Sequence, residues 1–182
     1  MAWAIFRARL AAWPILHTVR LMTFQEAVPG LVAGDFTRLA PLFAMPAEGG
    51  LCQALRWIDE GRFAGEPAAL AEAFSCACFN GCTAAVQEFL ARGVNPSGGQ
   101  LTGLNAFHWA ANRGQLPVVE LLLEAGAPLE TRNSYGGTVL GCTVWSAVHE
   151  PKPAHLAIIT ALLAAGAKVA AAAFPSGDAR VD

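Results

Sequence analysis

Charged residues are scarce in this chain, and they are nowhere concentrated. Charged side chains make up 14% of its 182 residues, and its twelve basic residues are scattered along the sequence. Such a distribution excludes the basic surface with which a protein neutralises a nucleic-acid backbone. Hydrophobic residues, in contrast, make up 54% of the chain, which excludes a disordered protein and favours one compact domain. We therefore expect a folded monomer that does not bind nucleic acid.

A regular cysteine framework is also missing. The five cysteines are an odd number without a repeated spacing, so disulfides are not expected and a reducing cytoplasm suits these residues. Cys76, Cys78 and Cys82 form a C-x-C-x₃-C pattern. A helix over residues 76–78 would point alternate side chains apart, and no fourth ligand is evident nearby, so a zinc site is not expected.

The sequence motifs of common catalytic sites are absent. Neither a glycine-rich phosphate loop nor a nucleophile elbow occurs in the chain. The segment from His149 to His155 has the wrong spacing for a helical metalloprotease motif, and its two prolines prevent a single helical face. We predict that this segment is an exposed loop. We expect no catalytic residues, no metal and no cofactor.

The chain also lacks a long uninterrupted hydrophobic run. This absence limits what the N-terminal extension, residues 1–22, could be. Arg7 and Arg9 precede a short apolar run, residues 10–19, that contains Pro14 and His17. This run is too short for a membrane span and matches a secretory signal poorly.

Three interpretations of this N-terminal extension stay open. Four large apolar residues recur at helical spacing, namely Trp3, Phe6, Leu10 and Trp13. They suit an amphipathic helix at a membrane surface, or a helix that lies on the core as a cap. Alternatively, translation starts at Met22, because residues 23–26 (Thr-Phe-Gln-Glu) form a capping box that would begin a helix.

A fixed period is the strongest pattern that the sequence does contain, and it is about 33 residues long. Five residue pairs have this separation: Gly81 and Gly114, Val86 and Val119, Leu90 and Leu123, Gly93 and Gly126, and Gly103 and Gly136. A fixed period predicts a stack of repeated units, which here are residues 67–99, 100–132 and 133–172. The last unit is longer, because the separation of Gly126 and Gly166 exceeds this period, and excising residues 149–155 restores the register.

The middle unit predicts two helices joined by a tight turn. Asn105 is suited to cap the first helix, residues 106–111 supply its apolar face, and Gly114 ends it. Pro117 is tolerated in the first turn of the second helix. Turn-forming residues 127–137 follow, so a loop or hairpin leads to the next pair. Helices this short need stacked neighbours to bury their apolar faces.

These residues resemble the ankyrin repeat, a unit of about 33 residues with the signature T-P-L-H-x-A. The middle unit matches best, in residues 103–111 (Gly-Leu-Asn-Ala-Phe-His-Trp-Ala-Ala). The first unit has Ser75 and the third has Gly141 where the middle unit has the signature histidine, His108. The resemblance implies an all-α solenoid of stacked antiparallel helix pairs with short hairpin-like loops, in which His108 is a structural hydrogen-bonding residue.

The resemblance extends weakly upstream, where residues 32–43 look like the turn and second helix of a degenerate capping repeat. The chain would then comprise an apolar and basic extension (1–22), a degenerate repeat with an insertion (23–66), the three repeats (67–172) and a tail (173–182). The alanine content and the ratio of ten arginines to two lysines indicate a bacterial source.

Ankyrin-repeat proteins are typically binding scaffolds, so the resemblance implies a non-catalytic protein that binds a partner protein. In such stacks the loop tips and the exposed face of each first helix form a concave groove. By position, the groove comprises Phe79, Asn80, Leu101, Thr102, Leu104, Asn112, Arg113, Ser134, Tyr135 and Trp145. Tyr135 lies at a predicted loop tip, whereas Phe79 and Trp145 are equally compatible with core positions. The alternative function is a membrane-surface-associated protein anchored by residues 1–22.

Overall fold

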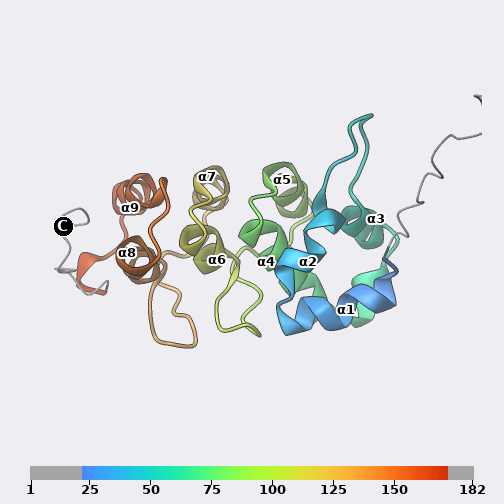
Figure 1. The fold of residues 1–182 in the computed structure, drawn as a ribbon, viewed down its shortest axis with the longest axis horizontal. Helices are drawn as coiled ribbons and strands as arrows, with labels where there is room; N and C mark the ends of the chain where they lie inside the picture. Colours follow the sequence, from blue (N-terminus) through green and yellow to red (C-terminus); the bar gives the residue numbers. More distant parts are fainter. Residues whose placement is uncertain (1–21, 172–182) are drawn as a thin grey trace, which may run out of the picture.

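The computed structural model describes residues 22–171, and every regular element in that range is helical, which confirms the all-α fold class (Figure 1). Residues 1–21 and 172–182, which hold most of the predicted extension and the predicted tail, lie outside the described residues. The elements in chain order are α1 (Phe24–Ala33), α2 (Phe36–Leu39), the 3-10 helix η1 (Ala40–Phe43), α3 (Gln53–Asp59), the 3-10 helix η2 (Arg62–Gly65), α4 (Pro67–Phe79), α5 (Thr83–Ala91), α6 (Ala106–Asn112), α7 (Leu116–Glu124), α8 (Val139–His149), α9 (His155–Ala164) and the 3-10 helix η3 (Val169–Ala171).

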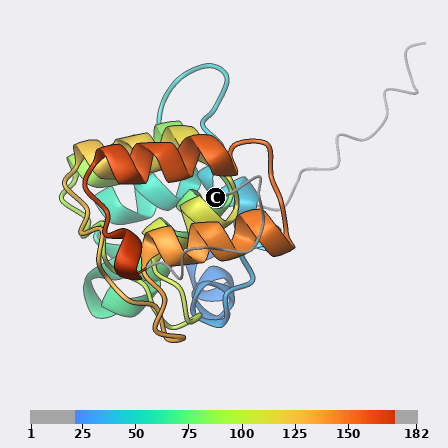
Figure 2. The ribbon, with the colours of Figure 1, turned by 90° about the vertical axis from the view of Figure 1, so that its left-hand side faces the viewer.

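Three helix pairs, α4–α5, α6–α7 and α8–α9, form a stack (Figure 1). The first helices of the pairs lie in one row and the second helices in a parallel row, while the loops that precede α6 and α8 project beyond the row of first helices. Figure 2 looks along the stack from its C-terminal end, where α9 lies over α8. The pairs share one hydrophobic core, because each short helix buries its apolar stripe against its neighbours.

The turn inside a pair is built in the same way at Gly81 and Gly114. Both glycines have a positive φ, 68° and 74°, which is a backbone region that a side chain disfavours. The glycine N–H donates to the carbonyl three residues earlier, and the next N–H donates to the carbonyl five residues earlier. These bonds satisfy carbonyls that the helix end would leave unpaired. Gly34, between α1 and α2, makes the same two bonds.

The predicted helix starts are confirmed. The side chain of Asn105 accepts the backbone N–H of His108 at 3.0 Å; Thr138, a cap that the sequence analysis did not identify, accepts that of Gly141 at 3.2 Å. Pro117 is the second residue of α7, where its missing N–H needs no partner. Thr23 and Glu26 form the reciprocal capping box at the start of α1.

The N-terminal helices are anchored to the rest of the molecule by aromatic packing. Phe24 of α1 meets the rings of Trp57 and Phe63 edge-on, with centroids 5.4 and 4.9 Å apart. All three rings are buried. In addition, the side chain of Gln53 in α3 donates to the carbonyl of Met22. These contacts make α1 part of the hydrophobic core rather than an appendage.

The extra residues of the last pair are placed differently from the prediction. Helix α8 has 11 residues against 7 in α6, so it continues to His149, and only residues 150–154 connect it to α9. Residues 150–153 are exposed. His155, however, begins α9 and is 1% exposed, so the prediction of an exposed loop is wrong for this residue.

A hydrogen bond between neighbouring pairs explains the placement of His155. Its ring Nε2 lies 3.0 Å from the carbonyl oxygen of Asn112. Gln115 makes the equivalent contact one pair earlier, donating from Nε2 to the carbonyl of Phe79 at 3.2 Å. His155 therefore corresponds in register to Gln115, and the inserted residues are 148–154.

Candidate functional site

The predicted groove residues lie on one face of the stack. This face is formed by the side of α4, α6 and α8 that faces away from the core, together with the loops that precede α6 and α8. We call it the inner face. Three of the predicted groove residues, Phe79, Asn112 and Trp145, are related by the sequence period. Phe79 and Asn112 are partly buried, and Asn112 donates to the hydroxyl of Ser146 at 2.7 Å. Trp145 is 51% exposed. The inner face is therefore most open toward its C-terminal end.

The N-terminal segment covers the inner face over α4. The ring of Phe36, the first residue of α2, meets the rings of Phe79 and Trp109 edge-on, with centroids 5.6 and 5.9 Å apart. Phe79 and Trp109 also contact each other, with centroids 5.2 Å apart. Phe36 is 2% exposed. The segment from α1 to α2 thus crosses the end of α4 and reaches α6.

Hydrogen bonds to the carbonyl oxygen of Phe36 hold the α1–α2 segment in place over α4. The side-chain amide of Asn80 donates to the carbonyl oxygen of Phe36 at 2.9 Å and to that of Cys76 at the same distance. The thiol of Cys76 donates to the Phe36 carbonyl as well, with a sulfur–oxygen distance of 3.6 Å. Asn80, a predicted groove residue, is engaged within the chain.

Two further predicted residues, Thr102 and Leu104, are partly buried in the loop before α6. The hydroxyl of Thr102 accepts the indole N–H of Trp109 at 2.9 Å and donates to the carbonyl of Leu104 at 3.3 Å. Thr102 also lies against Gly34, where a Cβ atom would approach its methyl carbon to 2.6 Å. Thr102 and Leu104 therefore make contacts within the chain that hold the loop before α6 in place.

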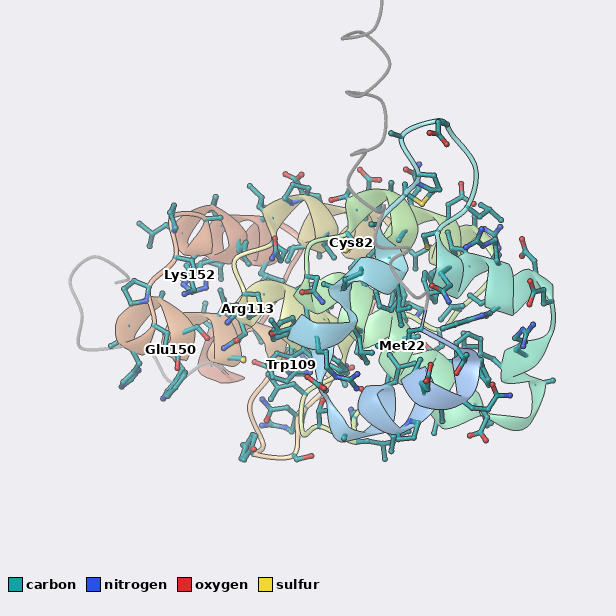
Figure 3. The ribbon with its side chains drawn as sticks, turned by 45° about the vertical axis from the view of Figure 1, so that its right-hand side comes forward. Met22, Cys82, Trp109, Arg113, Glu150 and Lys152 are labelled. Atoms are coloured by element: carbon teal, nitrogen blue, oxygen red, sulfur yellow. The ribbon has the colours of Figure 1, made fainter. Side chains whose placement is uncertain are left out.

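Arg113 and Trp145 lie where the N-terminal segment leaves the inner face open. Arg113 is exposed, and its guanidinium carbon lies 4.6 Å from the centroid of the Phe79 ring. Trp145 stacks on His149, one turn further along α8, with centroids 4.6 Å apart and planes inclined by 15°. Figure 3 shows Arg113 on the same side of the molecule as Glu150 and Lys152 of the α8–α9 loop.

The two projecting loops contact each other and carry the remaining predicted residues. Tyr135 is 81% exposed, and its ring would be 3.3 Å from a Cβ atom on Gly103 of the preceding loop. Ser134 is exposed, and its backbone N–H donates to the carbonyl of Gly103 at 2.9 Å. The side chain of Leu101 is exposed, while its N–H donates to the buried carboxylate of Glu72 at 2.8 Å.

Sequence reasoning missed Phe36 and Trp109, which decide how much of the inner face is open. Trp109 directly follows the signature histidine, so its position on the first helix predicts an outward side chain. An outward tryptophan at position 109 that contacts Phe79 forms an apolar surface, and such a surface indicates that another segment of the chain packs on it. The resemblance of residues 32–43 to the turn and second helix of a degenerate repeat did not reveal that Phe36 packs against Phe79 and Trp109.

His108 has the structural role that the resemblance implies. The ring is fully buried, with Nδ1 2.7 Å from the side-chain oxygen of Asn105 and Nε2 3.1 Å from the carbonyl oxygen of Gly137. It therefore joins α6 to the loop before α8. Burial lowers the pKa of this ring, and hydrogen bonds to the carbonyls of Gly137 and Thr131 oppose that shift.

The five thiols are free, and their surroundings favour the protonated form. Burial raises the pKa of Cys52, Cys76, Cys78 and Cys82, and it raises that of Cys142 to about 11. Among residues 22–171, no three His, Cys, Asp or Glu side chains are grouped so that they could hold a metal ion.

The chain belongs to the ankyrin-repeat family. A family model for three copies of the ankyrin repeat matches residues 74–173, which is more than half of the sequence. No curated protein is similar enough to be matched to it. Ankyrin repeats generally mediate protein–protein interaction, and proteins of this family are generally not enzymes. The boundaries of the individual units and the choice of binding residues stay predictions.

Proposed function

We propose that the protein is a scaffold that binds a partner protein through the open part of its inner face and its loop tips. One observation carries the proposal: two aromatic side chains on that face, Tyr135 and Trp145, are 81% and 51% exposed. Aromatic and arginine side chains supply much of the binding energy in protein interfaces. Arg113, exposed on the same face, completes this set.

The predicted groove residues then have two different roles. Phe79, Asn80, Thr102, Leu104 and Asn112 make contacts within the chain, so they hold the shape of the site. Leu101, Arg113, Ser134, Tyr135 and Trp145 are exposed and supply the contacts to the partner. Preformed surroundings favour binding because fewer side chains have to be ordered when the partner arrives.

The test compares capture of the native partner by three proteins. Replacement of both Tyr135 and Trp145 by alanine should weaken binding about thirtyfold or more, since loss of such an anchor commonly costs about 2 kcal/mol or more. The melting temperature should change little, because surface substitutions usually stay within about 0.5 kcal/mol. Glu120→Ala, an exposed position on α7, is the control. If the control loses the partner while the double variant keeps it, the proposed surface is wrong.

A reducing compartment, the cytoplasm, is the proposed location, supported by the five free thiols. Fractionation of the source cells tests it. Within residues 22–171 no helix is long and apolar enough to cross a bilayer. The alternative of a membrane-surface anchor depends on residues 1–22, almost all outside the described residues, and binding of the full chain to anionic vesicles tests it. A bacterial source stays a prediction from composition.

A further inference from the structure

Arg113 presents a guanidinium group that has no acceptor in the described part of the chain. The residue is exposed directly after α6, and its guanidinium carbon lies 4.6 Å from the centroid of the Phe79 ring. Within residues 22–171 the guanidinium group forms no ion pair and no hydrogen bond. The ring of Phe79 thus supports one face of the guanidinium plane, while the N–H donors at its edge remain available.

Most other arginines of the described range donate to an acceptor in the chain. The ion pairs join Arg38 to Asp35, Arg62 to Glu60, and Arg92 to both Asp59 and Glu88. Arg132 donates to the carbonyl of Gly136. Arg56 on α3 is exposed and also has no acceptor among the described residues, but no aromatic ring of those residues lies against it. Available donors and a supporting ring therefore occur together at Arg113.

A second cation, Lys152, lies beside Arg113. A Cβ atom on Gly114, which directly follows Arg113, would be 2.8 Å from the Cβ atom of Lys152. Lys152 is exposed, as is Glu150, and Figure 3 shows both on the same side of the molecule as Arg113. In the range that the structure describes, neither Lys152 nor Glu150 belongs to an ion pair. Two positive charges thus lie beside one negative charge.

An aromatic side chain borders these cations. Asn112, directly before Arg113, donates to the hydroxyl of Ser146 at 2.7 Å, and this bond holds the end of α6 against α8. Trp145 directly precedes Ser146, is 51% exposed, and stacks on His149 with centroids 4.6 Å apart. We call this group of four residues the cationic edge of the inner face: Arg113, Trp145, Glu150 and Lys152.

We propose that the cationic edge binds an acidic segment of the partner protein, with a carboxylate on Arg113 and an apolar side chain beside it on Trp145. This inference rests on the proposed partner-binding function and names the chemistry of the segment that is bound. The planar fork of an arginine matches the two oxygens of a carboxylate, and Lys152 adds attraction. Because the ring of Phe79 already supports the guanidinium group, less side-chain freedom is lost on binding.

Other anionic partners fit the cationic edge less well. A nucleic acid or an anionic bilayer is bound through many contacts to phosphate groups, whereas this edge offers two cations. A phosphorylated side chain carries close to two negative charges, so the exposed Glu150 repels it more strongly than it repels a carboxylate. The single excess positive charge of the cationic edge matches a single carboxylate.

Selection of binders from a library of random peptides tests the proposal on the full chain. Peptides that the wild type retains should be enriched in aspartate and glutamate, and added NaCl should weaken their binding. For a retained acidic peptide, Arg113→Gln should weaken binding about tenfold or more, because a hydrogen bond to a charged group is lost. Arg113→Lys keeps the charge without the planar fork, so its affinity should lie between those of Arg113→Gln and the wild type.

Two further variants test the sign of the charge. Lys152→Gln should weaken binding of the same peptide by about two- to fivefold, the range for an exposed charge pair. Glu150→Gln should tighten binding by a similar factor, because it removes a repulsion. Arg56→Gln, also an exposed arginine without an acceptor in the described range, is the matched control and should leave the affinity unchanged. Loss of a purely structural contact would not produce opposite effects at Lys152 and Glu150.

Several results would overturn this inference. They are retention of no peptide, retained peptides without an excess of acidic residues, and equal affinities for Arg113→Gln and Arg56→Gln. Binding that tightens about tenfold when phosphoserine replaces the acidic residue would identify a phosphate group as the ligand instead. Retained neutral peptides that still require Tyr135 and Trp145 would overturn the acidic segment but support the partner-binding surface. Peptides that require neither those aromatic residues nor Arg113 would contradict both proposals.

Discussion

Glu72 is a buried acid in α4 whose two carboxylate oxygens differ in their surroundings. One oxygen accepts the N–H of Leu101, while the other has no hydrogen-bond partner in the structure. Burial raises the pKa of this carboxyl group. Because the pKa in the folded state is raised, the stability that this group contributes is fully present below its ordinary value of 4.5 and is lost as the pH rises through the folded-state value.

Replacement of Glu72 by glutamine should therefore stabilise the protein at neutral pH. The neutral amide keeps an oxygen for the N–H of Leu101 and removes the buried charge. We expect a gain of about 1 kcal/mol at pH 7, within the range for an unsatisfied buried polar group, and a smaller gain at pH 5. Urea unfolding at the two pH values measures it. Glu124→Gln, at an exposed position, is the control, and an equal gain for both variants would refute the explanation.

At the scale of the element, the α8–α9 connection depends on a histidine in a defined tautomer. The backbone N–H of Lys152 donates to Nδ1 of His155 at 3.1 Å, so the ring proton is on Nε2, which donates to the carbonyl of Asn112. Protonation of Nδ1 would break the bond from Lys152. Burial lowers the pKa of His155, and the nearby positive charge of Lys152 adds to this effect.

Acid should consequently weaken this connection. Since the folded-state pKa lies below the ordinary value of 6.5, the stability contributed by His155 is fully present above pH 6.5 and is lost as the pH falls through the folded-state pKa. His155→Gln retains a donor for the Asn112 carbonyl, as Gln115 does for Phe79. The variant should lose about 1 kcal/mol at pH 7.5, but its melting temperature should fall less than that of the wild type between pH 7.5 and 5.5.

The exposed neighbour His149 provides the matched control for this prediction. It lies in α8, so His149→Gln changes the same residue type outside the connection. This variant should keep the acid sensitivity of the wild type. His108, whose pKa is also lowered by burial, stays in all variants, so some sensitivity will remain in His155→Gln. Identical pH profiles for the wild type and His155→Gln would contradict the assigned role.

At the scale of the whole molecule, structural features that recur with the sequence period could be predicted from the sequence, whereas features that occur only once could not. The glycine turn at Gly114 and the cap at Asn105 are local chemistry that recurs with the period, so they could be read directly. The hydrogen bond from His155 to the carbonyl of Asn112 in the preceding helix pair could not be predicted. It depends on how far α8 extends, and no glycine marks the end of that helix. The packing of Phe36 against Phe79 could not be predicted either, because the weak match of residues 32–43 to a repeat does not show which residues α2 contacts.

Two cysteines of α4 report whether this N-terminal cover opens independently of the repeats. Both side chains are fully buried, but the Cys76 thiol lies under α2, where it donates to the Phe36 carbonyl. In the wild type we expect a maleimide to label both thiols at the same slow rate, because α1 shares a core with the rest of the molecule and opens only with it. Fragment-ion mass spectrometry distinguishes the two sites.

Phe36→Ala should separate the two labelling rates. The substitution removes the ring that packs on Phe79 and Trp109, and loss of a buried phenylalanine typically costs about 3–5 kcal/mol. That loss falls on the contact between α2 and the inner face, so Cys76 should be labelled at least tenfold faster than Cys78, the factor that corresponds to about 1.4 kcal/mol of local opening. Faster labelling of Cys76 already in the wild type would show that the inner face over α4 opens on its own and is available to a partner. Equal rates in Phe36→Ala would show instead that α1, α2 and the repeats form one inseparable cooperative unit.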